Sequence, residues 1–273
     1  MLNINKVYFI HYLKLLGIPQ REPSLAYLEE IIKAQLLKVP FENVSKLYYL
    51  KTSGLKSIPD FEQFLTGIEK YHFGGTCYAN NYYLNLLLNF LGYDVKLCGA
   101  DMSRPDVHIA NIVTIDSKEY IADTGYGAPF LEPLPRSLDK DYIIESGLDK
   151  YVLKPQDNHG RSRLELYRKG KVQHGYLLKP QARDIDEFNN SIAESFNPSA
   201  TFMNAAVLTK FSQGCSNIIH NMSSIEIKGQ DVNRKSFDTK EELIEAIEKI
   251  FGIPVNISES ALTDISMNQG VWD

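Results

Sequence analysis

The chain has 273 residues, 44% of them hydrophobic and 23% charged, which is typical of an ordinary globular protein. Its formal net charge is −5, and its lysines and arginines are scattered rather than clustered. This excludes the basic surface that nucleic acid or acidic lipid requires. At this length we expect two or three modest structural units.

Targeting, membrane and metal signals are absent from the sequence. The first six residues lack the charged-then-apolar layout of a signal peptide, and no window approaches eighteen uninterrupted apolar residues. Cys77, Cys98 and Cys215 are widely spaced, so we expect reduced thiols. Without a C-x-x-C, H-E-x-x-H or Walker motif we expect no metal and no nucleotide-phosphate site. These features predict a soluble protein of the cytoplasm, with no membrane or nucleic-acid partner.

Hydrophobic periodicity predicts a helical unit in the first ninety residues. Apolar residues recur at helical spacing in 5–16, 24–36, 60–68 and 76–91. Asp60 and Gln63 form a candidate capping box, and Thr76 is a good N-cap residue. Residues 39–44, between the second and third helices, are expected to be irregular.

After Gly92 the hydrophobic period changes from 3.6 to 2, which predicts strands. They are expected at 94–100, 107–115, 120–123, 151–153, 164–166 and 172–178, a spacing that indicates a sandwich or a barrel. A short helix is expected at 184–195, then an antiparallel meander at 202–211, 216–220 and 224–228, and a last helix from the capping box Thr239-x-x-Glu242. Helices, then strands, then a mixed end predict an α+β fold.

The first candidate site is Phe73-Gly74-Gly75-Thr76-Cys77. Two glycines permit a close backbone approach, and Cys77 falls in the first turn of an apolar helix. The partial positive charge of a helix N-terminus favours the thiolate, which is the nucleophilic form of cysteine. A small buried core residue is the alternative interpretation. A catalytic role requires a base.

The segment 107–123 supplies that base. If Asp116-Ser117 is a two-residue turn, Ile115 pairs with Lys118, and His108 lies on the face of Asp123 one diagonal step away. A loop of odd length would put the two side chains on opposite faces. The strand then enters the bend 124–127, where two glycines let a ligand approach the backbone. Cys77, His108 and Asp123 would be nucleophile, base and orienter of the base.

Other candidates carry weaker signals. His72 could act as a base, but it has no evident orienting group. Cys98 and Cys215 have no glycine-rich approach and are interpreted as packing residues. The remaining histidines show no metal-ligand spacing and are interpreted as surface or hydrogen-bonded polar residues, namely His11, His159, His174 and His220.

Several motifs in this order resemble those of the arylamine N-acetyltransferase family. Residues 39–43 are similar to its P-F-E-N segment, and Gly74-Gly75-Thr76-Cys77 with Asn81 resembles its R-G-G-x-C-x-x-x-N helix start. Residues 107–116 and 120–127 resemble its histidine strand and its D-x-G-[FY]-G segment, and 197–202 resembles the segment leading into its third domain. The motifs span most of the chain.

This resemblance implies a helical bundle over 1–92, an antiparallel β-barrel over 93–195 and an α/β lid over 196–273, around a cysteine-protease-like Cys-His-Asp core. It implies acetyl-CoA as acyl donor, no metal, and an acetyl-cysteine intermediate on Cys77 in a ping-pong reaction. The acceptor would be an arylamine, a hydrazine or an N-hydroxyarylamine, in a pocket lined by Phe41, Tyr126 and Gly127. We expect a monomer or weak homo-oligomer that acts in xenobiotic metabolism.

The chain also departs from the family. Phe73 replaces the arginine before the glycine pair, so the Glu42 carboxylate needs another partner, such as His72, or must be solvated or protonated. Ala79 and Asn80 replace larger or acidic residues. The competing interpretations are a cysteine hydrolase or transglutaminase-like enzyme, an acyltransferase or amide synthase with another donor (malonyl or propionyl), and a weakly active or non-catalytic relative.

Overall fold

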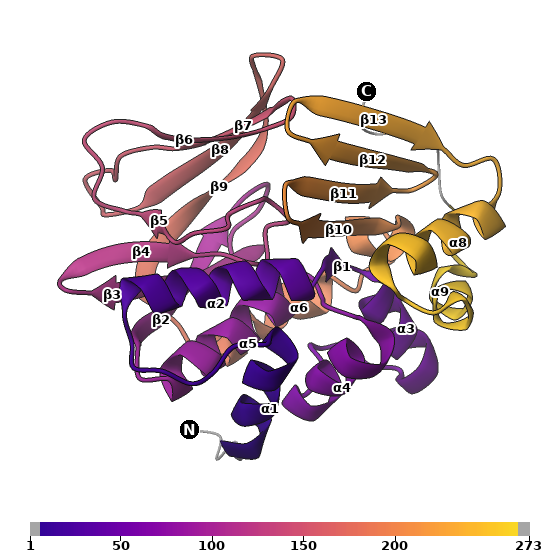
Figure 1. Ribbon diagram of the computed structural model, residues 1–273, viewed down its shortest axis with the longest axis horizontal. Coiled ribbons are helices and arrows are strands. Elements are labelled where there is room, and N and C mark those ends of the chain that lie inside the picture. The colour runs from indigo at the N-terminus through magenta and orange to yellow at the C-terminus, as the bar shows by residue number, and fades with distance from the viewer. Residues whose placement is uncertain (1–5, 267–273) are drawn as a thin grey trace.

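The computed structural model describes residues 6–266, and its N-terminal part is helical (Figure 1). The helices are α1 (Lys6–Leu16), α2 (Leu25–Lys38), α3 (Val44–Ser53), α4 (Phe61–Tyr71) and α5 (Cys77–Phe90). Local signals explain the predicted boundaries, because Ser24 caps α2 and the Asp60–Gln63 capping box begins α4. Helix α3 was not predicted; it is short, and it packs against a helix from the far end of the chain, α9 (Val255–Leu262).

Eight antiparallel strands form the curled sheet of the predicted fold class, in the order β5-β4-β3-β2-β9-β8-β7-β6 (Figure 1). Their bounds are β2 (Asp94–Asp101), β3 (His108–Ile115), β4 (Lys118–Ala122), β5 (Leu134–Pro135), β6 (Tyr142–Ser146), β7 (Asp149–Leu153), β8 (Ser162–Arg168) and β9 (Lys171–Ala182). The short β5 and β6 were not predicted. The sheet places β9 beside β2, although about seventy residues separate them in sequence.

The predicted helix at 184–195 is present as the 3₁₀ turn η1 (Ile185–Phe188) and α6 (Asn189–Glu194). A second antiparallel sheet follows, in the order β1-β10-β11-β12-β13, and α8 (Lys240–Phe251) and α9 lie at its end (Figure 1). Its strands are β1 (Phe41–Glu42), β10 (Val207–Ser212), β11 (Cys215–His220), β12 (Ser223–Lys228) and β13 (Asp231–Ser236). Strand β13 and helix α9 were not predicted; β13 is a polar, largely exposed edge strand without apolar alternation.

The strand predicted over 202–211 is wrong in its first half. Helix α7 (Thr201–Asn204) precedes β10, and the amide of Asn43 donates to the carbonyls of Phe202 and Ala205. Asn43 also accepts from the backbone N–H of Val207. A tertiary contact with the 41–43 segment therefore ends the helical turn and begins the strand.

Helix α5 is the element that positions the candidate site. It packs against β2 and β3, and Leu84, Leu87 and Leu88 on its apolar face are fully buried. Its first turn consequently lies against the strand that carries His108. In residues 6–266, every helix falls short of the length and apolar character needed to cross a membrane.

Candidate active site

Cys77 is the first residue of α5, and the two preceding glycines let two backbone segments meet there. An added Cβ at Gly74 would lie 1.8 Å from the carbonyl oxygen of Pro40, and one at Gly75 would lie 2.8 Å from the Cβ of Ala79. The backbone N–H of Glu42 donates to the carbonyl of Gly75 across this contact, at 3.1 Å. Thr76 occupies the N-cap position as predicted, although its side chain makes no capping hydrogen bond.

The β3–β4 hairpin has the predicted register. Asp116 and Ser117 form the turn with φ of 50° and 60°, and Ile115 pairs with Lys118. The Nε2 atom of His108 lies 2.8 Å from the Oδ2 atom of Asp123, and both side chains are buried. Because the turn has two residues, the imidazole and the carboxylate lie on the same face of the sheet, as the sequence predicts.

Electrostatics favour the charged forms of His108 and Asp123. Burial lowers the pKa of His108, but the charge and hydrogen bond of Asp123, with further interactions from Cys77, outweigh it and raise the pKa to about 10. Burial acts to raise the pKa of Asp123, and the charge and hydrogen bond of His108 lower it overall, helped by hydrogen bonds from Asn81 and Gly125. An imidazolium held in this way can balance a thiolate.

The side chain of Asn81 links α5 to β3 and to the bend after β4. Its amide nitrogen donates to the carbonyl of Ile109 at 2.6 Å and to Oδ1 of Asp123 at 2.8 Å. Its amide oxygen accepts the backbone N–H of Thr124 at 2.9 Å. An added Cβ at Gly125 would lie 2.7 Å from the Cα of Cys77. One amide and one glycine thus hold the 123–125 bend directly against the nucleophile candidate.

Two tyrosines border the imidazole. Tyr176 stacks on His108 with ring centres 4.9 Å apart, and Tyr126 meets it edge-on at 5.7 Å. The hydroxyl of Tyr126 lies 2.7 Å from Nδ1 of His174, and burial lowers the pKa of His174. A neutral His174 can therefore accept a hydrogen bond from the Tyr126 hydroxyl, which fixes the Tyr126 ring.

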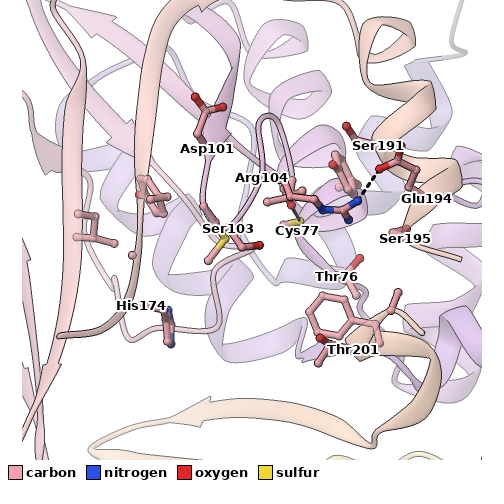
Figure 2. Close-up of a pocket in the computed structure, with 18 of the residues that line it drawn as sticks. Thr76, Cys77, Asp101, Ser103, Arg104, His174, Ser191, Glu194, Ser195 and Thr201 are labelled. Carbon is pink, nitrogen blue, oxygen red and sulfur yellow. Dashed lines mark hydrogen bonds and ion pairs between the residues drawn. The ribbon is translucent and has the colours of Figure 1, made fainter. Parts of the chain in front are cut away.

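Two cavities meet at Cys77. The larger, about 840 Å³, has a polar wall that includes Arg104, Arg163 and Glu194, and Arg104 reaches from the 101–107 loop to Glu194 on α6 (Figure 2). The second, about 400 Å³, is mainly apolar and is bordered by His108 and by the three predicted substrate-binding residues, Phe41, Tyr126 and Gly127. The thiol thus borders a larger cavity with charged side chains on its wall and a smaller, mainly apolar one.

Glu42 has another partner in place of the arginine, which is one of the expected alternatives, but the partner is not His72. Its carboxylate accepts the backbone N–H of Ser45, at the N-terminus of α3, at 2.8 Å and that of Gly74 at 3.0 Å, and these two groups replace the missing arginine. His72, the suggested partner, is instead the left-handed C-cap of α4 and packs against Gly252. Burial raises the pKa of Glu42 despite these hydrogen bonds.

The remaining sequence candidates fall into two groups. Cys98 is buried and Cys215 is half-buried on β11, and neither lines the cavities at Cys77. His174 and His220, which were interpreted as surface or satisfied polar residues, both line the apolar cavity. Only the position of β9 and β11 in the sheets reveals this. Within residues 6–266, no three histidine, cysteine or acidic side chains are grouped as a metal site.

A family model described as N-acetyltransferase matches residues 24–260. The chain belongs to the arylamine N-acetyltransferase family. Among similar proteins, the pineal gland isozyme NAT-3 of Gallus gallus is 26% identical over 90% of this chain and 96% of its own. An N-malonyltransferase of Fusarium pseudograminearum is 30% identical over 43% of each chain.

Solved structures of the family share the fold. The arylamine N-acetyltransferase of Mycobacterium marinum, determined in complex with CoA, superposes with a TM-score of 0.77 at 18% identity over 94% of this chain and 99% of that chain. The Bacillus anthracis enzyme gives 0.73 at 22% identity over 92% and 100%. The chain is accordingly an acyltransferase with the α+β fold of this family.

Proposed function

We propose that the protein is an acetyl-CoA-dependent arylamine N-acetyltransferase, which also acetylates hydrazines and the oxygen of N-hydroxyarylamines. The observation that carries this proposal is the buried His108–Asp123 pair beside a cysteine that borders two cavities. Cys77 is the proposed nucleophile, His108 the acid and base, and Asp123 the group that orients His108.

The reaction follows a ping-pong course. The Cys77 thiolate attacks the thioester carbonyl of acetyl-CoA, a carbon–sulfur bond forms, and the CoA thiolate leaves with the proton of the His108 imidazolium. Neutral His108 then takes a proton from the attacking amine, and the amide forms as the cysteine thiolate departs. The backbone N–H groups in the first turn of α5 have no partner within the helix and suit the oxyanion, at about 3–4 kcal/mol per donor.

The two cavities suggest separate positions for the substrates. The apolar cavity, with the rings of Phe41 and Tyr126 on its wall, suits a flat aryl group. The larger cavity, with a volume of about 840 Å³, is the one with room for the bulky donor, and the relative from Mycobacterium marinum was determined in complex with CoA. A different donor remains the second candidate, since a relative is an N-malonyltransferase.

The wider setting is also proposed. We infer domains at 1–92, 93–195 and 196–273, action in the cytoplasm on foreign small molecules, and a monomer or weak homo-oligomer. Pairing of β1 with β10 supports a lid that is fixed to the helical domain near Phe41.

Intact mass spectrometry after brief exposure to acetyl-CoA without amine tests the proposal. One acetyl group on the wild type, absent from Cys77→Ala, retained by the control Cys215→Ser and discharged by an arylamine, is the expected result. If an equimolar mixture of acetyl-CoA and malonyl-CoA gave mainly a malonyl adduct, malonyl-CoA would replace acetyl-CoA as the proposed donor. No adduct, or one that survives Cys77→Ala, would overturn the proposal.

A further inference from the structure

Lys46 on α3 is a partly buried cation with an unusual set of partners. Its Nζ atom donates to the hydroxyl of Ser195 at 2.6 Å and lies 3.8 Å from the centre of the Phe196 ring. Neither partner carries a negative charge. Among residues 6–266, Lys46 forms no ion pair with a carboxylate.

The Lys46 side chain lies next to residues 74–76, the segment that leads into α5 and Cys77. Lys46 lines a small space of about 30 Å³, together with Gly74, Gly75 and Thr76. Thr76 and Ser195 line both this space and the large cavity at Cys77 (Figure 2). The space that Lys46 lines and the cavity that Cys77 lines therefore share the side chains of Thr76 and Ser195, and Ser195 is also the hydrogen-bond partner of Lys46.

Lys46 and Cys77 interact electrostatically. Burial lowers the pKa of Lys46 to about 8, and the negative charge of Cys77 acts in the opposite direction. Because Phe73 replaces the family's arginine, the positive charge of that arginine is missing near Glu42. The Glu42 carboxylate is hydrogen-bonded by backbone N–H groups instead. An interaction that favours the ammonium must favour the thiolate equally, because the coupling is reciprocal.

We propose that Lys46 is a positioning residue that stabilises the Cys77 thiolate and extends the reactivity of the nucleophile to lower pH. This rests on the proposed function, because it takes Cys77 as the nucleophile. Lys46 acts through the field at the start of α5 and does not touch the substrate.

The other titratable groups near Cys77 have partners of their own. His108 on β3 is paired with Asp123, Arg104 in the 101–107 loop is paired with Glu194, and Tyr78 on α5 donates to the carbonyl of Asp106. Around Lys46 itself the small space adds Tyr49, and burial raises the pKa of Tyr49 to about 12. Tyr49 therefore stays neutral near pH 8 and does not replace the lysine charge.

The test measures the rate of Cys77 alkylation by iodoacetamide against pH, in the full chain, between about pH 4.5 and 9. Lys46→Met removes the charge, Lys46→Arg retains it, and Lys210→Met is the matched control. Lys210 is also a half-buried lysine with a lowered pKa, but it donates to carbonyls at the end of α8.

We expect Lys46→Met to move the low-pH midpoint of the profile upward by about one unit, which slows alkylation about tenfold below the midpoint. Lys46→Arg and Lys210→Met should keep the wild-type midpoint. A second measurement avoids substitution: the pKa of Lys46, followed by NMR of its side chain, should fall once Cys77 is capped.

Two results would overturn the inference. One is a Lys46→Met profile with an unchanged midpoint, whether or not the rate falls uniformly, since uniform loss marks a purely structural role. The other is a Lys46 pKa that does not respond to capping. If wild-type Cys77 reacts no faster than Cys98 and Cys215 at low pH, the proposed function fails instead, so the two failures are distinguishable.

Discussion

Restoring the family residue at position 73 should destabilise this protein. Phe73 is 1% exposed, and its ring centre lies 5.2 Å from that of Tyr71 and 5.8 Å from those of Tyr48 and Tyr49. Phe73→Arg removes this packing, a loss of about 3–5 kcal/mol for a buried phenylalanine. The guanidinium must also be desolvated, while Glu42 already accepts two backbone N–H groups.

We therefore expect Phe73→Arg to lower the free energy of unfolding by about 3–5 kcal/mol. Urea denaturation at neutral pH, followed by circular dichroism, measures this, and an unchanged m-value confirms that the same transition is compared. Phe73→Leu is the matched control and should cost less than about 1.5 kcal/mol. An arginine variant as stable as wild type would refute the reasoning, because the side chain would then reach Glu42 and replace the packing.

Three further predictions follow from the site. In Glu42→Gln an amide NH₂ must face a backbone N–H, so the free energy of unfolding, measured by urea titration, should fall by about 1–3 kcal/mol. No loss of stability would contradict the hydrogen bonds that the Glu42 oxygens accept. Gly125→Ala places a Cβ 2.7 Å from the Cα of Cys77, so kcat/KM for arylamine acetylation should fall about 100-fold, and normal turnover would show that the bend yields freely. The raised pKa of His108 stabilises the fold fully below about pH 6.5 and loses that effect as pH approaches 10, so the stability advantage of wild type over His108→Gln should shrink across this range. A constant advantage between those limits would argue against the shift.

Short-range sequence patterns were sufficient to predict the positions of Cys77, His108 and Asp123. The two-residue turn at Asp116-Ser117 fixes the register of β3 and β4, and a side-chain period of two then places His108 and Asp123 on one face. The glycine pair and the apolar stripe likewise located Cys77 at a helix start. These features depend on residues that are neighbours in sequence or across one hairpin.

Sequence patterns alone were insufficient for helix α3 and for the polar residues around the site. Helix α3 depends on packing against α9, about two hundred residues away, and its short apolar pattern is weak by itself. His174 reaches the cavity because β9 pairs with β2, and periodicity does not encode which strands become neighbours. The partner of Glu42 and the position of Lys46 also depend on α3.

The sequence by itself determined the family, the α+β class and the Cys77, His108 and Asp123 candidates, because these depend on local spacing and on motifs in a fixed order. The tertiary structure decided what surrounds them. It supplies Glu42 with backbone N–H groups, surrounds Phe73 with tyrosines and places Lys46 next to the residues that precede Cys77. The burial of a side chain and the charges around it depend on segments that are far apart in the sequence. Only the folded chain brings those segments together.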